Sequence, residues 1–270
     1  MGRRQRTYAG VRNAPDTLRA VSTIVVPFHL DSRIDPFESP LPAGRTIAPE
    51  LPSGGAWERM AALYEDVARA VSRDAAPVVI SGDCTTSIAT VAGLAQTGES
   101  PGIVWLDAHG DFNTEETTES GYLGGMPLAK ICGLGNLEVA ERLGLAPVDP
   151  KSVLLVGARD LDPEEDELLA SEGVRRASVE GLRIGDLPAG PLYLHVDVDV
   201  ADAADLPGLI FPVPGGPGQS ELTAAIGTVA SSGRLAAVGV GLTWNVDGRG
   251  SDTRTDYVRQ ILEPLRDWSG

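Results

Sequence analysis

The feature that most constrains the fold is the alternation of two kinds of segment along the chain. Apolar, β-branched runs predict strands at 22–30, 77–83, 102–108, 152–158, 191–200 and 235–243. Segments with helical spacing follow at 56–75, 86–96, 163–173, 220–232 and 256–268. The strand runs are apolar throughout rather than alternating, as expected in a parallel sheet covered on both faces. This order predicts right-handed crossovers and an α/β fold with one doubly wound sheet.

Length, charge and cysteine content narrow the class of protein further. A chain of 270 residues suits a single α/β domain over 1–270, with Pro/Gly-rich surface loops at 31–55 and 203–219. No run of about 18 apolar residues predicts a membrane span, and the basic N-terminus lacks the apolar segment of a signal peptide. The net charge of −16 argues against a nucleic-acid partner. Two cysteines form no disulfide framework, which favours the cytoplasm.

Three of the predicted strands end in side chains that can bind metal ions. These are Asp83 and Cys84 after the second run, Asp107, His109 and Asp111 after the third, and His195, Asp197 and Asp199 in the fifth. On extended backbone, residues two apart project to the same side. In a doubly wound sheet the carboxyl ends of the strands form the functional crevice, so we expect these groups to meet there.

The donor types indicate the chemistry of this crevice. Crowded carboxylates repel one another and raise each other's pKa unless cations neutralise them. Carboxylate and imidazole ligands suit a divalent ion such as Mn²⁺, and this many ligands suit two ions that share bridging carboxylates. One Asp-x-Asp alone is typical of a solvated loop, but "DAHGDFN" after an apolar strand, together with a second such strand end, predicts a dinuclear site.

These motifs resemble those of the arginase (ureohydrolase) family from about residue 77 to 247. The family's Gly-Gly-Asp-His-Ser appears as "SGDCT", its Asp-Ala-His-x-Asp-x-Asn as "DAHGDFN", and its Asp-Val-Asp at 197–199. The resemblance implies a three-layer α/β/α sandwich with a mainly parallel sheet. The segment "AGVRNAPDTLRA" is similar to one that follows the family's first strand, yet it begins here at residue 9. Either that strand is missing or 23–28 takes its place.

The resemblance also implies how the metals are held. Asp107 and Asp197 would bridge the ions, Asp111 would complete the first site, and His109 and Asp199 the second. Cys84 stands where the family has a His that binds only the first ion. Mn²⁺ is the expected ion, and Zn²⁺ or Fe²⁺ are alternatives because a thiolate is softer than an imidazole and suits Mn²⁺ poorly. In the other interpretation, Cys84 is a neutral buried thiol that fills space.

In the family, a metal-bridging hydroxide attacks the guanidinium carbon. Asp111 would hydrogen-bond the hydroxide and pass its proton to the leaving amine. The family's proton-shuttle His is replaced by Gly124, and His195 lies where a small residue is usual. His195 is therefore a candidate proton carrier or a partner of the metal ligands, and the alternative is a core histidine whose hydrogen bonds are satisfied.

The substrate positions are partly kept and partly changed. By resemblance, Asn113 and Ser120 would bind an α-carboxylate and Asp162 an α-amino group, although Asn113 and Asp162 are also typical turn and cap residues. A last group departs from the family: Tyr122 replaces an Asn, Phe211 a Thr, and Thr243 the Glu that binds the guanidinium. Without that Glu, the desolvation of a guanidinium is no longer compensated, so we expect a less basic substrate than arginine.

Three hypotheses follow for the function. The first is a metal-dependent hydrolase that cleaves a C–N bond of a guanidino or amidino group in a small, arginine-derived molecule. The second is an Nω-hydroxy-L-arginine amidinohydrolase of antibiotic biosynthesis, since some such enzymes resemble this chain in carrying Cys at the same position. The third is a non-catalytic paralogue that binds a metal or ligand. By resemblance, the assembly is expected to be a homo-oligomer, either a trimer or a hexamer.

Overall fold

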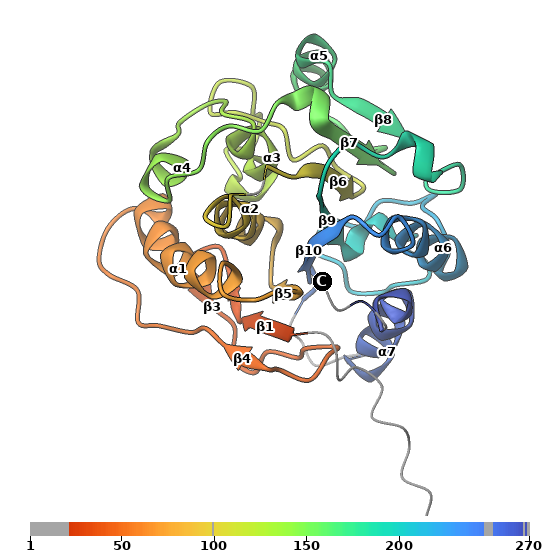
Figure 1. The fold of residues 1–270 in the computed structure, drawn as a ribbon, viewed down its shortest axis with the longest axis horizontal. Coiled ribbons are helices and arrows are strands. Elements are labelled where there is room, and N and C mark those ends of the chain that lie inside the picture. Colours follow the sequence, from red (N-terminus) through yellow and green to blue (C-terminus); the bar gives the residue numbers. More distant parts are fainter. Residues whose placement is uncertain (1–21, 99, 246–250, 267, 269–270) are drawn as a thin grey trace, which may run out of the picture.

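The fold is built on one parallel sheet of eight strands (Figure 1). The structure, a computed structural model, describes residues 22–98, 100–245, 251–266 and 268. The sheet order is β4-β1-β5-β10-β9-β6-β7-β8, and every neighbouring pair is parallel. The strands are β1 Ser22–Val26, β4 Arg45–Thr46, β5 Pro77–Ser81, β6 Gly102–Leu106, β7 Val153–Val156, β8 Arg175–Ala177, β9 Leu192–Asp197 and β10 Leu235–Gly241. A separate antiparallel hairpin pairs β2 Phe28–His29 with β3 Ser32–Arg33.

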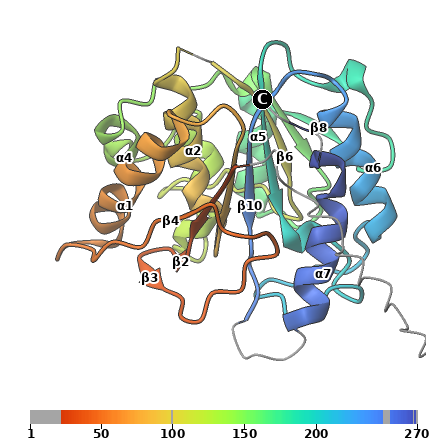
Figure 2. The same ribbon diagram turned by 60° about the horizontal axis from the view of Figure 1, so that its bottom comes forward.

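Helices cover both faces of the sheet (Figure 2). They are α1 Ala56–Val71, α2 Ser87–Ala95, α3 Pro127–Ile131, α4 Glu138–Arg142, α5 Pro163–Glu172, α6 Gln219–Ala230 and α7 Ser251–Ile261. Helices α1 to α4 pack on one face and α6 and α7 on the other, each face with its own apolar core. Neighbouring strand residues enter different cores: Trp105 and Tyr193 face the α1–α4 side, Val104 and Leu194 the other. The predicted three-layer α/β/α fold is confirmed.

The six predicted strand regions and five predicted helical regions all contain the expected element. Pro27 divides the first strand region, where β1 ends and the β2–β3 hairpin begins, because proline cannot donate a ladder hydrogen bond. Three strands were missed: β3 and β4, both inside the predicted loop 31–55, and β8. All three are short strands with exposed arginines, which hide the apolar pattern of a strand. The segment "AGVRNAPDTLRA" lies outside the described residues.

The strand order decides where the metal-binding side chains lie. β5, β10, β9 and β6 are consecutive neighbours in the centre of the sheet, so the carboxyl ends of β5, β9 and β6 lie close together. β10 separates β5 from β9 and ends in Gly241, whose missing side chain leaves room there. A Cβ at Gly241 would lie 3.2 Å from Cys84 Sγ and 3.5 Å from Asp197 Oδ2. None of the described helices is long and apolar enough to cross a membrane.

Candidate metal centre

Two of the strand ends use the same local turn. The Asp107 carboxylate accepts a hydrogen bond from the His109 backbone N–H at 2.8 Å, and Asp197 accepts one from the Asp199 N–H at 2.9 Å. Extended backbone explains why His195 and Asp197 share a face, since both lie within β9. That argument was wrong for His109 and Asp199, which lie beyond the strands. The aspartate-capped turns, rather than strand geometry, bring these two residues back to the site.

The donor atoms gather in two overlapping groups. One contains Cys84, Asp107, His195 and Asp197, and the other contains Asp107, His109 and Asp199. Within each group, one ligand atom per residue lies within 4.8 Å of all the others. Asp107 is common to both groups, which is the arrangement expected of a bridging carboxylate.

His109 carries the positive charge that partly balances this cluster. Its Nδ1 lies 3.2 Å from the Asp199 carboxylate and 3.4 Å from that of Asp107. Burial lowers the pKa of His109, but the hydrogen bonds to Asp107 and Asp199 outweigh burial and raise it to about 12. The same two carboxylates that attract the protonated imidazole would also attract a metal cation bound at this position.

The remaining carboxylates carry charge that one imidazolium does not balance. Burial, followed by the charge of Asp107, raises the pKa of Asp199 to about 7. The pKa of Asp197 is raised well above its usual range by burial and by Asp199, and that of Asp111 by burial and by Asp107. These groups repel one another when ionised, so divalent cations would stabilise the ionised cluster.

Cys84 lies at the start of the turn after β5, directly against Asp197. Its Sγ is 2.6 Å from Asp197 Oδ2 and 3.9 Å from Asp107 Oδ2. Burial, then Asp197 and Asp111, raises the pKa of this thiol well above its usual range. The thiol therefore keeps its proton beside these carboxylates, and binding of a cation would favour its release.

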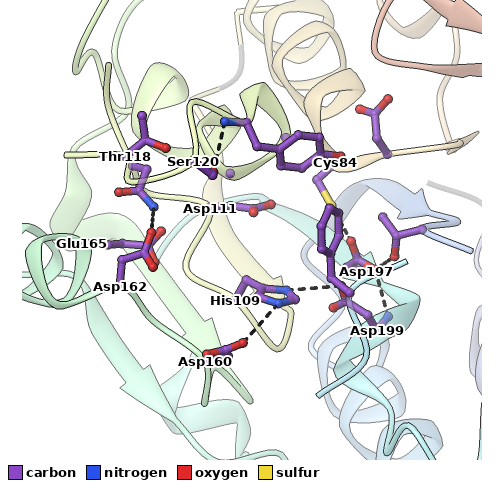
Figure 3. Close-up of a pocket in the computed structure, with 17 residues that line it drawn as sticks. Cys84, His109, Asp111, Thr118, Ser120, Asp160, Asp162, Glu165, Asp197 and Asp199 are labelled. Carbon is purple, nitrogen blue, oxygen red and sulfur yellow. Dashed lines mark hydrogen bonds and ion pairs between the residues drawn. The ribbon is translucent and has the colours of Figure 1, made fainter. Parts of the chain in front are cut away.

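Asp111 lies near both groups but belongs to neither of them. Its backbone is in the left-handed region, with φ of 51°, and its carbonyl accepts hydrogen bonds from the first turn of α3. The neighbouring Phe112 N–H donates to the buried Glu165 at 2.8 Å. Figure 3 shows the Asp111 carboxylate directed into the pocket between Cys84 and His109. This position suits a side chain that meets a substrate beside the metals.

Three buried polar atoms of the cluster lack a hydrogen-bond partner within the described part of the chain, which supports metal binding at this site. Asp111 Oδ2, His195 Nε2 and Asp199 Oδ1 have no hydrogen-bond partner among the residues that the structure describes. Buried polar groups of native proteins are almost always paired, so such a concentration needs a ligand to explain it. Carboxylate, imidazole and thiolate donors in this arrangement fit a pair of divalent transition-metal ions.

All six predicted substrate-binding residues line one cavity above these groups, with a volume of about 370 Å³ (Figure 3). They are Asn113, Ser120, Tyr122, Asp162, Phe211 and Thr243. Asn113 donates to Asp162 at 3.1 Å and accepts from Thr117 at 2.9 Å, so these two predicted recognition residues also hold each other. Ser120 is exposed at the rim, where its hydroxyl accepts from the Tyr122 N–H.

Tyr122 and Phe211 form the aromatic wall of the cavity, with ring centroids 5.0 Å apart. The Tyr122 ring lies over Gly124, and a Cβ at that position would overlap the ring. Its hydroxyl is 3.0 Å from His29 Nε2, while His29 Nδ1 lies 3.1 Å from the Gly82 carbonyl. Tyr122 therefore fills the space that a larger residue at 124 would need, and the β2–β3 hairpin supports it.

Thr243 is turned toward the metal cluster rather than toward open cavity space. Its hydroxyl donates to Asp197 Oδ1, and the residue is buried two positions beyond the end of β10. Thr243 therefore supplies a short side chain that orients a predicted metal ligand.

Several residues of the site were missed by sequence reasoning. Trp105 donates its indole N–H to Asp107 Oδ2 at 3.1 Å, and Ser87 Oγ lies 3.0 Å from His195 Nδ1. Glu165 is buried beneath the "DAHGDFN" loop, and burial raises its pKa to about 7. Trp105 resembles an ordinary core aromatic in the sequence, and Glu165 an ordinary acidic residue in a first helical turn. Only the long-range contacts distinguish them.

Comparisons with known proteins agree with the geometry. A sequence model of the arginase family matches residues 1–240. The arginase of Bacillus caldovelox is 35% identical over 173 residues, which are 59% of this chain and 57% of that protein. An N(omega)-hydroxy-L-arginine amidinohydrolase of Streptomyces lavendulae is 28% identical over 215 residues, 78% of this chain and 76% of that one. The structure of the Bacillus caldovelox arginase superposes with a TM-score of 0.77 at 25% identity, covering 92% of this chain and 98% of that chain.

Proposed function

Because the chain belongs to the arginase family, we propose that it is a metal-dependent hydrolase that cleaves a C–N bond of an amidino group. The observation that carries the proposal is the pair of overlapping donor groups at the base of one cavity. When bound, divalent ions in such groups supply Lewis-acid activation of a water molecule near neutral pH. Cys84, Asp107, His109, Asp197 and Asp199 would hold these ions.

Asp111 is the proposed proton carrier of the reaction. Its Oδ2 has no partner among the described residues, and its carboxylate points into the cavity. Burial and the neighbouring Asp107 favour its protonated form. A carboxylic acid held at this position can deliver a proton to the leaving amine, which is the step that breaks the C–N bond.

The cavity supports a substrate with an amino-acid end and a weakly basic reacting end. Asp160 and Asp162 lie at its mouth, and no Lys or Arg occurs among the described lining residues, so an ammonium group is favoured there. At the reacting end, Thr243 supplies no carboxylate to compensate a fully charged guanidinium. Nω-hydroxyarginine is less basic than arginine and carries the same amino-acid end. We propose it, or another arginine-derived amidine, as the substrate.

Turnover assays test this proposal directly. Protein loaded with Mn²⁺ or Zn²⁺ should release hydroxyurea and ornithine from Nω-hydroxyarginine, with a higher kcat/KM than for urea release from arginine, agmatine or guanidinobutyrate. Asp111→Asn should lower kcat by about 10²- to 10⁴-fold, whereas Asp66→Asn, at a half-buried position that does not line the cavity, should leave it unchanged. A protein that retains metal but turns over none of these compounds would favour the non-catalytic interpretation.

Two further parts of the proposal rest on composition and resemblance. Both cysteines are free, which supports a reducing, cytoplasmic location. By resemblance to the family, the chain is proposed to form a homo-oligomer, either a trimer or a hexamer. Light scattering coupled to size-exclusion chromatography would measure the assembly mass, and a monomeric mass would contradict this part.

A further inference from the structure

The buried imidazole of His195 is a group whose contacts the proposed reaction leaves unexplained. His195 is 1% exposed and lies in the middle of the sheet, where its backbone aligns with Trp105 of β6 on one side and Gly239 of β10 on the other. Its ring stacks on the Trp105 indole, with centroids 3.8 Å apart. A Cβ at Gly239 would lie 3.4 Å from His195 Nδ1. The ring is therefore held in one place by its neighbours.

The two ring nitrogens of His195 have different surroundings. Nδ1 lies 3.0 Å from Ser87 Oγ, which also accepts a hydrogen bond from the Tyr193 hydroxyl at 2.8 Å. With the proton on Nδ1, the imidazole donates to Ser87 and its Nε2 carries a free lone pair. Nε2 is buried and has no partner among the residues that the structure describes. A core histidine with satisfied hydrogen bonds would not leave this atom unpaired.

The atoms around His195 are metal-binding groups. One ring nitrogen, Cys84 Sγ and one carboxylate oxygen each from Asp107 and Asp197 lie within 4.8 Å of one another. Histidines that bind metals usually donate their other ring N–H to a neighbouring acceptor, and Ser87 Oγ, 3.0 Å from Nδ1, is placed to be that acceptor.

We propose that His195 Nε2 is a metal ligand, which with Cys84, Asp107 and Asp197 completes a site of one nitrogen, one sulfur and two carboxylate donors. The inference rests on the proposed function, because it assumes that the cluster binds metal. Four donors of these types form a set that Zn²⁺ accepts in tetrahedral geometry and that suits Mn²⁺ less well. The assignment also leaves Asp111, which lies outside both groups, free to carry a proton.

A nuclear magnetic resonance experiment on the unmodified sequence tests the assignment. The chain has three histidines, so the imidazole nitrogens of ¹⁵N-labelled protein can be separated and followed as Zn²⁺ is added. His29 contacts the Tyr122 hydroxyl and belongs to neither donor group, and His29→Gln identifies its signals by their loss. Zn²⁺ should shift the Nε2 signal of His195 as well as the signals of His109, and leave those of His29 in place.

The outcomes separate this inference from the proposed function. Two responding histidines other than His29 support ligation by His195. If Zn²⁺ binds and only one of the two responds, His195 is not a ligand, although the metal-dependent function stands. If Zn²⁺ does not bind at all, the inference is wrong, and the proposed function is wrong as well if Mn²⁺ also fails to bind.

Cobalt substitution gives a second, independent test. Co²⁺ bound at the Cys84 site should produce a thiolate-to-cobalt charge-transfer band in the near ultraviolet. His195→Ala should raise the Co²⁺ concentration at which this band reaches half of its maximal absorbance by about tenfold or more. His29→Ala should leave that concentration unchanged. An unchanged titration in a folded His195→Ala protein, as judged by its circular dichroism, would overturn the assignment. If that variant does not fold, the experiment on the unmodified chain still decides.

Discussion

Cys84 brings a sulfur atom into a cluster whose other donors are carboxylate oxygens and imidazole nitrogens. Its Sγ lies against Asp197, and Gly241 provides the space for this contact. A thiolate is a softer ligand than an imidazole, so the residue at this position influences which metal binds. At the scale of single residues, one side chain, Cys84, therefore distinguishes this site from a metal centre with only oxygen and nitrogen ligands.

We expect Cys84→His to shift metal preference toward Mn²⁺. The ratio of Zn²⁺ to Mn²⁺ affinity should fall by about tenfold or more, because a thiolate ligand is replaced by a harder imidazole. Competition titrations that follow both metals would measure this ratio. Cys132→Ser is the matched control, since Cys132 is buried in the apolar core and lies outside both donor groups. An unchanged ratio in Cys84→His would show that the thiol is not a determinant of metal choice.

Glu165 predicts a dependence of stability on pH. Burial raises its pKa from 4.5 to about 7, so the folded chain keeps a proton that the unfolded chain has already lost in this interval. Its contribution to stability is therefore complete below about pH 4.5 and is lost as the pH rises through about 7. Glu165→Gln keeps an acceptor for the Phe112 N–H but removes the titration.

The free energy of unfolding should reveal this effect. Relative to wild type, Glu165→Gln should gain on the order of 2 kcal/mol between about pH 5.5 and about pH 8.5 in the metal-free protein. Urea unfolding at the two pH values measures the difference. Glu164→Gln, an exposed neighbour in the same helical turn, controls for the loss of one charge. A pH-independent difference between wild type and Glu165→Gln would contradict the raised pKa.

At the scale of elements, the loop before α3 decides how much room the cavity leaves. Tyr122 occupies the volume above Gly124 and contacts the β2–β3 hairpin through His29. A loop residue and a hairpin far apart in the chain thus close the same side of the site. A large residue at position 124 requires a smaller residue at 122, because the two would share one space.

We therefore expect Gly124→His to lower the thermal midpoint and Tyr122→Asn to relieve that loss when the two are combined. The coupling in this double-mutant cycle should amount to about 0.5–3 kcal/mol, the range found for residues in contact. Calorimetry of both single variants and the double variant measures it. Gly125→His is the matched control, because a Cβ at Gly125 meets nothing within 4 Å. Equal stability of the two histidine variants would show that the Tyr122 ring moves away at no cost.

At the scale of the whole molecule, the ends of the central strands bring together buried carboxylates whose repulsion His109 offsets only in part. Asp107, Asp197 and Asp199 are each no more than 2% exposed. Metal binding should therefore stabilise the entire fold, because the unfolded chain does not assemble the site.

Zn²⁺ at about 100 times its Kd should add about 2.7 kcal/mol of stability, which raises Tm by about 5 °C in a chain of this size. Differential scanning calorimetry with Zn²⁺, and again after a chelator is added, measures the shift and its reversal. A potassium salt at the same ionic strength controls for screening. A Tm that is unaffected by saturating Zn²⁺, and equally by Mn²⁺, would contradict a metal site in the fold.

The sequence by itself determined the fold class and the identity of most donor groups. Parallel strands covered on both faces must be apolar throughout, so their runs are visible without any contact information. Because these runs are visible, the aspartates that directly follow them can also be identified from the sequence. Edge strands β4 and β8 stayed hidden, because exposed residues there carry no apolar pattern.

Only the tertiary structure decided which of those groups face one another. The order β5-β10-β9-β6 sets Cys84, Asp107 and Asp197 side by side, and no local pattern encodes that order. The unpaired Nε2 of His195, the ring of Tyr122 over Gly124 and the buried carboxylate of Glu165 all depend on residues distant in the chain. Local sequence specifies what a side chain can do, whereas packing between distant segments decides which partner it meets.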